Sequence, residues 1–340
     1  MKPGEKIVLD AALVGEDKWS QFVNQHQNGN IFHSPVLVSF YENVPFYMPV
    51  TIFYLDTNGE ILGLIVSYIL RESDGLLGSF SSRAIVWGGP LIKNGHEEIL
   101  SELLVVLKSC LKRKVSYIQI RNLFSTSEIK NAITSEGFVF EEHLNILFTL
   151  KKPLESLWKD VHPTRRKQIN RAVKKGVVIK VADKLDSDEL QQCYEILEQV
   201  YHNAKLPFPE KSFFEKAAGM ISGDGEFKAI IAYWNNEIIG FRFFLLFKGL
   251  IYDWYAGSNP AHYDKYPNDI LPWALIKWGH EHGCHTFDFG GAGNPKRKYG
   301  VRDYKLKFGG DTVNFGRYLF VCKPLIYYPA KLAFTILKKK

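Results

Sequence analysis

The sequence predicts an α/β (α+β) fold that is divided into two domains of similar size. The chain has 340 residues, which is long for one hydrophobic core and fits two domains of about 150 to 170 residues. Its composition, 46% hydrophobic and 23% charged, is that of a globular protein and excludes a disordered chain. The second half also repeats the element order expected for the first half, which indicates duplication of one α/β unit.

The elements of the first half follow from turn residues and hydrophobic spacing. Asp56-Thr57-Asn58-Gly59 lies between two apolar, β-branched runs and predicts a β-hairpin. Residues 97–111 carry apolar side chains at helical spacing. The expected order is a helix at 17–26, strands at 49–54, 61–70 and 84–87, a helix at 97–111, a strand at 116–121, a helix at 127–135 and a strand at 138–150.

The second half returns to this order after three helices. Trp254 is expected at the position of Trp87 in the repeated unit. Helices are expected at 164–176, 186–203 and 211–221, a three-stranded meander at 227–233, 238–247 and 250–255, a helix at 268–280 and a strand at 285–289. The predicted domains are residues 1–155 and residues 156–340, the second ending in a basic tail.

The predicted helix at 164–176 concentrates positive charge on one side. Thr164 is expected to cap its start and Gly176 its end. Like charges four residues apart destabilise an isolated helix by some tenths of a kcal/mol each, so the pattern requires either solvent or an anion. Two interpretations stay open, a solvated face and a face for a phosphate-rich ligand. The basic residues are Arg165, Arg166, Lys167, Arg171, Lys174 and Lys175.

The stretch 287–310 is the densest candidate for a binding site. A short strand carries Asp288 to its end, and a glycine cluster and three consecutive cations follow. Glycines let a backbone approach a ligand with bare N–H groups, and Lys and Arg supply charge-assisted donors to phosphate or carboxylate. The alternative is a basic surface loop before a glycine-pinned hairpin. The candidate ligand-binding residues are Gly290, Gly291, Lys296, Arg297 and Lys298.

Asp288 stands between two phenylalanines on the expected strand at 285–289. A carboxylate in such a place either caps the glycine loop or pairs with a lysine, and both are structural roles. The functional alternative is that it orients an amine substrate.

Several other chemistries are excluded by motif and geometry. His280, His282, Cys284 and His285 do not have the spacing of a metal site, so no metal is expected. The sequence lacks the Walker motif of NTPases, the GxSxG elbow of hydrolases and the GxGxxG loop of dehydrogenases. Its four cysteines form no CxxC pair, and no signal peptide or spanning segment is evident. A cytoplasmic location is therefore expected.

Charge and aromatic content point to an anionic partner. The net charge is +7, which is consistent with a nucleotide, RNA or an acidic lipid surface and does not choose among them. The tail from Arg317 to Lys340 combines aromatic residues with lysines. Two interpretations stay open for the tail, packing against the body of the protein and a peripheral contact with the inner membrane surface.

Several short motifs follow one another along the chain: Phe32–Pro35, Gly88–Leu91, Arg165–Lys175, Tyr263–Trp273, Phe287–Gly291, Tyr304-Lys305 and Phe308–Gly310. Taken in this order, they resemble those of the Fem-type (FemABX) aminoacyltransferases and their GNAT-like acetyltransferase relatives. The resemblance covers nearly the whole chain and implies two tandem GNAT-like domains. It also implies transfer of an amino acid from aminoacyl-tRNA to the stem-peptide amine of a peptidoglycan precursor.

The resemblance assigns roles to particular residues. Lys305, which follows Tyr304, matches an aromatic-Lys pair near the acyl donor. Arg165 and Arg166 match the basic segment that meets the phosphates of the precursor, and Tyr255 matches an aromatic position in the cleft. Lys305 and Asp288 are the expected catalytic residues, Lys305 meeting charge in the transition state or a donor phosphate.

The donor and the function class stay open among three hypotheses. The first is aminoacyl transfer from tRNA to an anionic, peptidoglycan-precursor-like substrate, without a cofactor. The chain lacks the long helical hairpin that some Fem-type members use for tRNA. The second is a coenzyme A thioester donor and an amino sugar or polysaccharide precursor as acceptor, although the Q/R-x-x-G-x-G/A pyrophosphate loop is missing. The third is a basic RNA- or membrane-binding module without catalysis.

Overall fold

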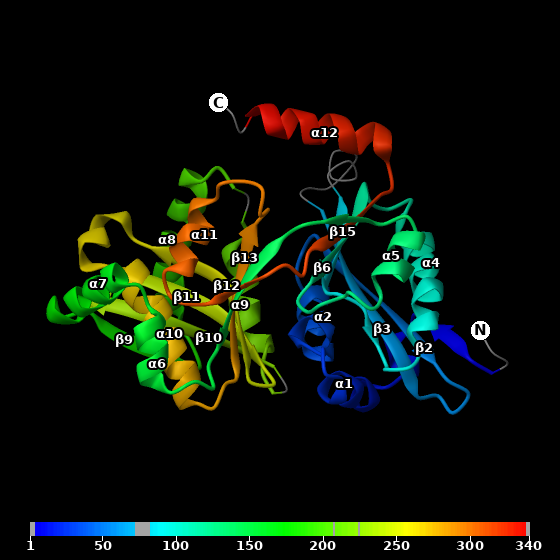
Figure 1. Cartoon of the computed structure of the whole chain (residues 1–340), viewed down its shortest axis with the longest axis horizontal. Coiled ribbons are helices and arrows are strands. Elements are labelled where there is room, and N and C mark those ends of the chain that lie inside the picture. The colour runs from blue at the N-terminus through cyan, green and yellow to red at the C-terminus, as the bar shows by residue number, and fades with distance from the viewer. Residues whose placement is uncertain (1–3, 72–81, 207, 224, 338–340) are drawn as a thin grey trace. The chain divides into compact units, whose positions relative to one another are not determined.

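The computed structural model describes residues 4–71, 82–206, 208–223 and 225–337. The chain forms two compact units, one of Met1–Glu142 with Phe315–Lys340 and one of His143–Asn314. Each unit holds a mixed β-sheet with helices against it (Figure 1). The predicted fold class, α/β with two domains built on mostly antiparallel sheets flanked by helices, is confirmed.

The sheet of the first unit has the strand order β1-β2-β3-β4-β6-β15-β7, with β5 paired to β3. Neighbouring strands are antiparallel except for β4 and β6, which run parallel. The strands are β1 (Lys6–Val8), β2 (Tyr47–Leu55), β3 (Ile61–Leu70), β4 (Arg83–Gly88), β5 (Leu91–Ile92), β6 (Tyr117–Asn122), β7 (Val139–Glu141) and β15 (Arg317–Val321).

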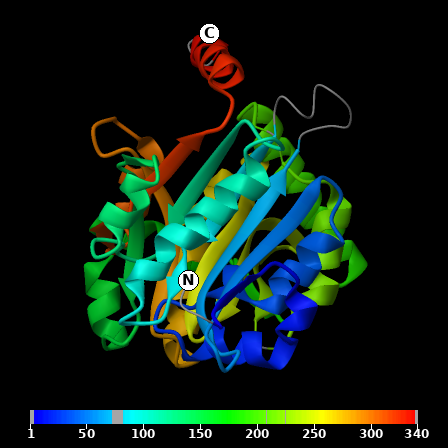
Figure 2. The ribbon, with the colours of Figure 1, turned by 90° about the vertical axis from the view of Figure 1, so that its right-hand side faces the viewer.

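Helices cover both faces of this sheet (Figure 2). Successive strand residues point to opposite faces. Ile52 of β2 belongs to the core beneath α4, and Phe53 meets Trp19 of α1 with ring centroids 5.2 Å apart. The helices of the unit are η1 (Ala11–Leu13), α1 (Glu16–Gln25), η2 (Ile31–His33), α2 (Pro35–Glu42), η3 (Glu97–Ile99), α4 (Leu100–Leu111), α5 (Lys130–Ser135) and α12 (Pro324–Leu337).

The sheet of the second unit has the order β14-β8-β13-β12-β11-β10-β9. Among the described strands of this sheet, only β12 and β13 are parallel neighbours. The strands are β8 (Leu144–Thr149), β9 (Val178–Ala182), β10 (Glu226–Trp234), β11 (Glu237–Phe247), β12 (Leu250–Ser258), β13 (Thr286–Gly293) and β14 (Asp311–Val313).

One face of the second sheet packs against the core of α6, α7 and α10, and the other lies against α8 and α9. Phe244 and Leu246 of β11 face the first group, and Phe243 faces α9 through Phe214. The helices are α6 (Leu154–Asp160), α7 (Pro163–Lys174), α8 (Ser187–Asn203), α9 (Lys211–Met220), η4 (Pro260–Lys265), α10 (Pro267–Glu281) and α11 (Gly300–Leu306).

The last strand of each half lies in the sheet of the other half. β7 leads into β8, which pairs with β13 and β14, and β14 leads into β15, which pairs with β6 and β7. The predicted division into residues 1–155 and 156–340 therefore differs from the compact units. The apolar run 138–150, predicted as one strand, is divided between the two sheets, and the strand of the predicted C-terminal tail belongs to the first unit.

Most predicted elements are present with small shifts at their ends. The helix predicted at 127–135 begins only at Lys130, and the helix predicted at 97–111 opens with the 3-10 turn η3. The cap of α7 is His162, whose side chain accepts from the Thr164 N–H, and not Thr164 itself. These differences concern local hydrogen bonds at element ends, which sequence spacing specifies weakly.

Candidate functional site

Strands β12 and β13 separate part of the way along their length. They pair in parallel only from Leu250 to Tyr252, opposite Thr286 to Asp288. Beyond this point β12 continues to Ser258 and β13 to Gly293. In the first unit the corresponding parallel strands β4 and β6 pair along the whole of β4, from Arg83 to Gly88. The second unit therefore has unpaired backbone between two central strands, called the opening below, where the first unit has a continuous ladder.

Lys305 of α11 reaches backbone acceptors at this opening. Its Nζ donates to the carbonyl oxygens of Phe289 and, at 3.2 Å, of Gly291. The ammonium thereby joins α11 to the backbone of β13 through two hydrogen bonds. Burial lowers the pKa of Lys305, and the nearby Asp253 carboxylate partly opposes this effect. Within the part of the chain that the structure describes, these bonds use two of the three N–H groups of the ammonium, so one remains for a ligand.

A buried ion pair lies beside the opening. Arg242 of β11 and Asp253 of β12 form a two-pronged pair, with Nε to Oδ1 at 2.9 Å and Nη2 to Oδ2 at 2.5 Å. Their side chains are 7% and 9% exposed. The ring of Phe289 stands between two cations, with Arg242 Cζ 4.8 Å and Lys305 Nζ 5.0 Å from its centroid. The opening is thus lined by fixed charges in a region of little water.

Asp288 is buried behind the glycine turn that follows it. Its side chain accepts from the Gly290 N–H at 2.7 Å and from Asn145 Nδ2 at 3.3 Å to each oxygen. Gly290 has a φ of 76°, which favours glycine. Within the described residues Asp288 forms no ion pair with a lysine. These contacts fit the cap of the glycine loop, and a catalytic role of Asp288 stays a prediction.

Burial raises the pKa of Asp288 from 3.8 to about 6, although the Gly290 and Asn145 hydrogen bonds favour the charged form. The folded protein therefore holds this proton more tightly than the unfolded chain does. The free energy of unfolding should fall by roughly 3 kcal/mol in all as the pH rises from about 3 to about 7. Asp288→Asn removes this titration, so the melting temperature of the variant should rise relative to wild type across that window. A constant difference in melting temperature from pH 4 to pH 7 contradicts the expectation.

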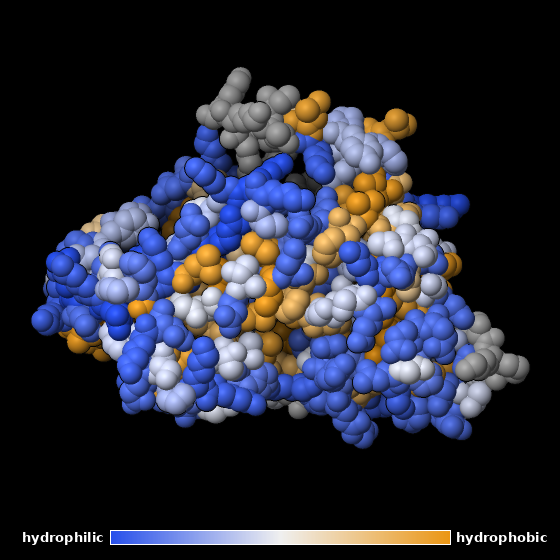
Figure 3. All heavy atoms as spheres, viewed as in Figure 1, coloured by the Kyte–Doolittle hydropathy of each residue, from blue (hydrophilic) through white to orange (hydrophobic). Residues whose placement is uncertain are grey.

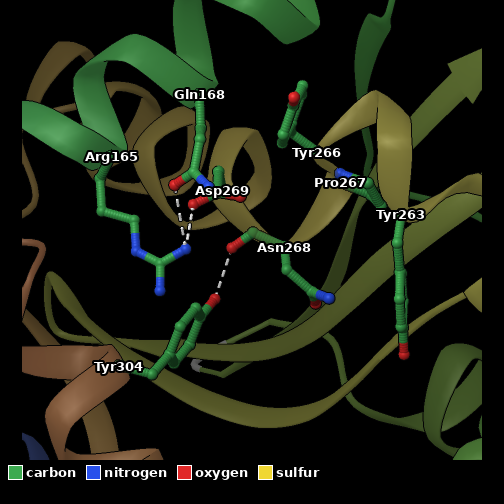
Figure 4. Close-up of a pocket in the computed structure, with 8 residues that line it drawn as sticks. All are labelled: Arg165, Gln168, Tyr263, Tyr266, Pro267, Asn268, Asp269 and Tyr304. Atoms are coloured by element: carbon green, nitrogen blue, oxygen red, sulfur yellow. Dashed lines mark hydrogen bonds and ion pairs between the residues drawn. The ribbon is translucent and has the colours of Figure 1, made fainter.

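A polar pocket of about 500 Å³ lies at the start of α10. Arg165 Nη1 donates to Asp269 Oδ1 at 2.5 Å and to Gln168 Oε1 at 3.2 Å (Figure 4). The Tyr304 hydroxyl donates to the Asn268 carbonyl at 2.5 Å, and burial raises the pKa of Tyr304 to about 12. The lining residues are Arg165, Gln168, Tyr263, Tyr266, Pro267, Asn268, Asp269 and Tyr304.

Arg165 is held on two sides in this pocket. Its guanidinium carbon lies 5.0 Å from the centroid of the Tyr304 ring, and its pair with the buried Asp269 fixes its direction. Burial raises the pKa of Asp269, and the Arg165 charge offsets part of that effect. The Nε atom of Arg165 is buried without a hydrogen-bond partner among the described residues. A buried donor without a partner is costly. The amide and hydroxyl groups that line the pocket fit a polar ligand.

The other predicted site residues lie apart from these two places. Arg166 is half-buried on α7, and Lys296, Arg297 and Lys298 are exposed in the turn after β13. Arg302 of α11 holds this turn by donating to the carbonyls of Asn294 and Arg297 at 2.9 and 2.6 Å. The basic loop is therefore fixed in place with its three cations toward solvent.

Tyr255 is on the other face of the sheet from α10. Its ring contacts Phe213 and Phe214 of α9, with centroids 6.1 and 5.0 Å away. The β11–β12 register shifts between Phe243 and Phe244. Phe243 therefore pairs with Tyr255, whereas Phe244 pairs with Asp253. The structure thus brings Lys305, Gly290 and Gly291 together, and Arg165 with Tyr304, but it does not bring Tyr255 to either group.

Sequence reasoning missed five residues of these places: Asn145, Gln168, Arg242, Asp253 and Asp269. Arg242 and Asp253 are charged residues inside apolar strand runs, which is a feature visible in the sequence. Asn145 and Gln168 carry no such feature. Among the described residues, no group of three or more His, Cys, Asp or Glu is placed to hold a metal ion.

Comparisons with known proteins agree with the fold. Residues 163–306 match the family model of the acetyltransferase (GNAT) domain. The structure resembles that of FemX with a TM-score of 0.72 at 15% sequence identity, over 95% of this chain and 98% of that chain. No curated protein matches the sequence.

Two further solved structures show the same arrangement. A tandem GNAT protein from the clavulanic acid biosynthesis pathway gives a TM-score of 0.60 at 11% identity, over 94% of this chain and 99% of that chain. The C-terminal domain of a putative lysylphosphatidylglycerol synthetase from Agrobacterium fabrum gives a TM-score of 0.60 at 13% identity, over 96% of this chain and 98% of that chain.

These likenesses confirm the two tandem GNAT-like domains that the sequence resemblance implied, and the family model identifies the second of them. Residues 163–306 thus match the acetyltransferase (GNAT) domain, and the chain has the fold of FemX over both units.

Proposed function

We propose that the chain transfers an aminoacyl group from aminoacyl-tRNA to an amine of an anionic cell-envelope precursor, with the donor's acyl group bound at the opening between β12 and β13. The observation that carries this proposal is the Lys305 ammonium held at that opening by two backbone carbonyls. The corresponding strands of the first unit are paired throughout, so the proposal assigns the donor to the second unit.

The chemistry needed is addition of a neutral amine to an ester carbonyl. The amine nitrogen forms a C–N bond, the C–O bond to the donor ribose breaks, and the proton lost by the amine goes to the leaving oxygen. Negative charge develops on the carbonyl oxygen in between. A preorganised donor there is worth about 3 to 4 kcal/mol, and the remaining N–H of Lys305 supplies one. Asp288 would act by holding the glycine turn, because both of its oxygens already accept hydrogen bonds.

The pocket at the start of α10 supports a donor that carries a nucleoside. Tyr263 is 50% exposed there, and aromatic rings at the edge of a polar pocket are stacking surfaces for bases. Gln168 and Asn268 add amide groups for polar contacts. Tyr304, which lines the pocket, directly precedes Lys305 in the chain. The acyl group of a ligand in this pocket would then be within the reach of α11.

A coenzyme A thioester is the second candidate donor, because residues 163–306 match a GNAT acetyltransferase family. Helix starts bind phosphates through bare N–H groups and a positive dipole end. The start of α10 has Pro267, which lacks an N–H, and the carboxylate of Asp269 in the first turn. The phosphates of either donor are therefore expected away from the start of α10.

The acceptor and the location follow from the same family resemblance. The neighbours FemX and the putative lysylphosphatidylglycerol synthetase support an acceptor in the cell envelope. We infer a peptidoglycan-precursor-like amine as acceptor and a cytoplasmic location for the protein. Arg166 and the exposed cations Lys296, Arg297 and Lys298 would attract the phosphates of such a precursor.

The assay that tests the proposal follows product by mass spectrometry. Purified protein is incubated with a UDP-linked muramyl pentapeptide and either a mixture of aminoacyl-tRNAs or acetyl-CoA. The expected product is the pentapeptide extended by one amino acid, formed only with the tRNA donors. Formation of acetylated pentapeptide would show instead that the acyl donor is a coenzyme A thioester. Absence of product with both donors, across amino-sugar acceptors as well, would contradict acyl transfer.

A variant of Tyr263 tests the pocket. Stacking of a base on an aromatic side chain is worth about 1 to 3 kcal/mol. Tyr263→Ala should therefore raise KM for the donor by about 10- to 100-fold, with the melting temperature unchanged because the ring is half exposed. Tyr263→Phe keeps the ring and serves as the matched control with wild-type KM. An unchanged KM in the alanine variant would place the donor elsewhere.

A further inference from the structure

The outward side of helix α12 (Pro324–Leu337) is apolar. Leu325, Tyr328 and Leu332 are 93%, 60% and 64% exposed, and Pro329 is exposed as well. Residues i, i+3, i+4 and i+7 share one side of a helix, so these four side chains form a single stripe about 100° wide. We call them the α12 stripe. Figure 3 shows hydrophobic side chains over α12 at the top of the view.

The opposite side of α12 is attached to the first unit. The Tyr327 ring meets Tyr117 of β6 with centroids 5.3 Å apart. The backbone N–H groups of Cys322 and Lys323 donate to the Ser116 carbonyl at 2.9 and 3.0 Å. The helix is therefore anchored through its inner side, and the stripe is not used for packing on the sheet to which it is attached.

The charge around the stripe has one sign. No Asp or Glu occurs from Cys322 to the end of the sequence. Lys323 precedes the helix, and Lys331 lies within it with its Nζ 5.4 Å from the centroid of the Tyr327 ring. Lys338, Lys339 and Lys340 follow and lie outside the described residues. An apolar stripe with lysines beside it fits the boundary of an anionic lipid surface, where each cation adds about 1 kcal/mol.

We propose that α12 docks the protein in the plane of an anionic membrane surface, with the stripe among the upper acyl chains and Lys323 and Lys331 toward the lipid phosphates. No helix among the described residues is long and apolar enough to span a bilayer, so the contact is with the surface. A second copy of the chain is a poorer occupant, because two such helices would bring like charges together. The inference stands independently of the proposed reaction.

The test is co-sedimentation with vesicles, in the absence of any substrate. Vesicles of phosphatidylcholine alone are compared with vesicles that contain one quarter phosphatidylglycerol. Wild type should bind the anionic vesicles and lose binding in high salt. Leu325→Glu/Leu332→Glu should lower the partition coefficient at least about tenfold. Leu13→Glu, at a position that is 74% exposed outside α12, is the matched control and should bind as wild type does.

Two outcomes would overturn the proposal. One is equal binding of wild type and the α12 double variant to the anionic vesicles. The other is a dimer in sedimentation equilibrium that the double variant abolishes, without vesicle binding by wild type, which would assign the stripe to a second copy. Equal melting temperatures of the three proteins exclude unfolding as the cause of a loss.

Discussion

Replacement of Lys305 by alanine is expected to lower kcat/KM for acyl transfer by about 10²- to 10³-fold, which is the usual cost of removing one donor to a developing oxyanion. The ammonium also satisfies the carbonyls of Phe289 and Gly291. The alanine variant should therefore lose stability as well, by about 1 to 3 kcal/mol for each carbonyl left buried without a donor. Steady-state kinetics and chemical denaturation of the same preparation measure both effects.

A glutamine at position 305 separates the two roles of the lysine. Its amide can donate to the two carbonyls but carries no charge. Lys305→Gln should keep more of the stability than the alanine variant while its kcat falls as far. Lys307→Ala, at an exposed lysine just past the end of the same helix, is the matched control with wild-type turnover. Full activity of the glutamine variant would contradict a catalytic role of Lys305 and leave it a structural role only.

Asp253→Ala is expected to destabilise the protein by about 3 to 5 kcal/mol, because it leaves the Arg242 guanidinium buried without its partner. The side chains of both partners are buried, and two hydrogen bonds join them. Arg242 also lies over the Phe289 ring beside the opening. The effect should appear as a lower midpoint in urea denaturation, with an unchanged slope.

The double variant Arg242→Met/Asp253→Leu provides the control for this pair. Replacing both partners of a buried ion pair by apolar residues is often neutral in stability. The double variant should recover most of the stability that Asp253→Ala loses, while activity stays low if the charges serve the reaction. A loss below about 1 kcal/mol in Asp253→Ala would show that water reaches the pair.

The sheets of both units could be predicted because their strands follow local patterns. The hairpin around Asp56–Gly59 and the meander of β10, β11 and β12 depend on turn residues and alternation, which the sequence shows directly. The exchange of β8 and β15 between the halves could not be predicted. An apolar strand such as 144–149 has the same pattern whichever sheet it joins, and only the assembled structure decides its partner.

The site was predictable where residues are close in sequence. The glycine turn, Asp288 and Lys305 lie within one stretch, and the structure brings them together through the hydrogen bonds of Gly290 and Gly291. The pair of Arg165 with Asp269 joins residues far apart in the chain. The position of Tyr255 depends on a register shift in the β11–β12 ladder, and no local sequence pattern predicts that shift.

A crystal structure with an adenosine that carries an amide-linked amino acid on its ribose, a stable mimic of the end of aminoacyl-tRNA, tests the central claim most directly. The account predicts the adenine beside Tyr263 and the amide carbonyl oxygen within hydrogen-bond distance of Lys305 Nζ, between β12 and β13. An analogue bound elsewhere, with that opening empty in crystals saturated with ligand, would contradict the assignment of Lys305 to the acyl group.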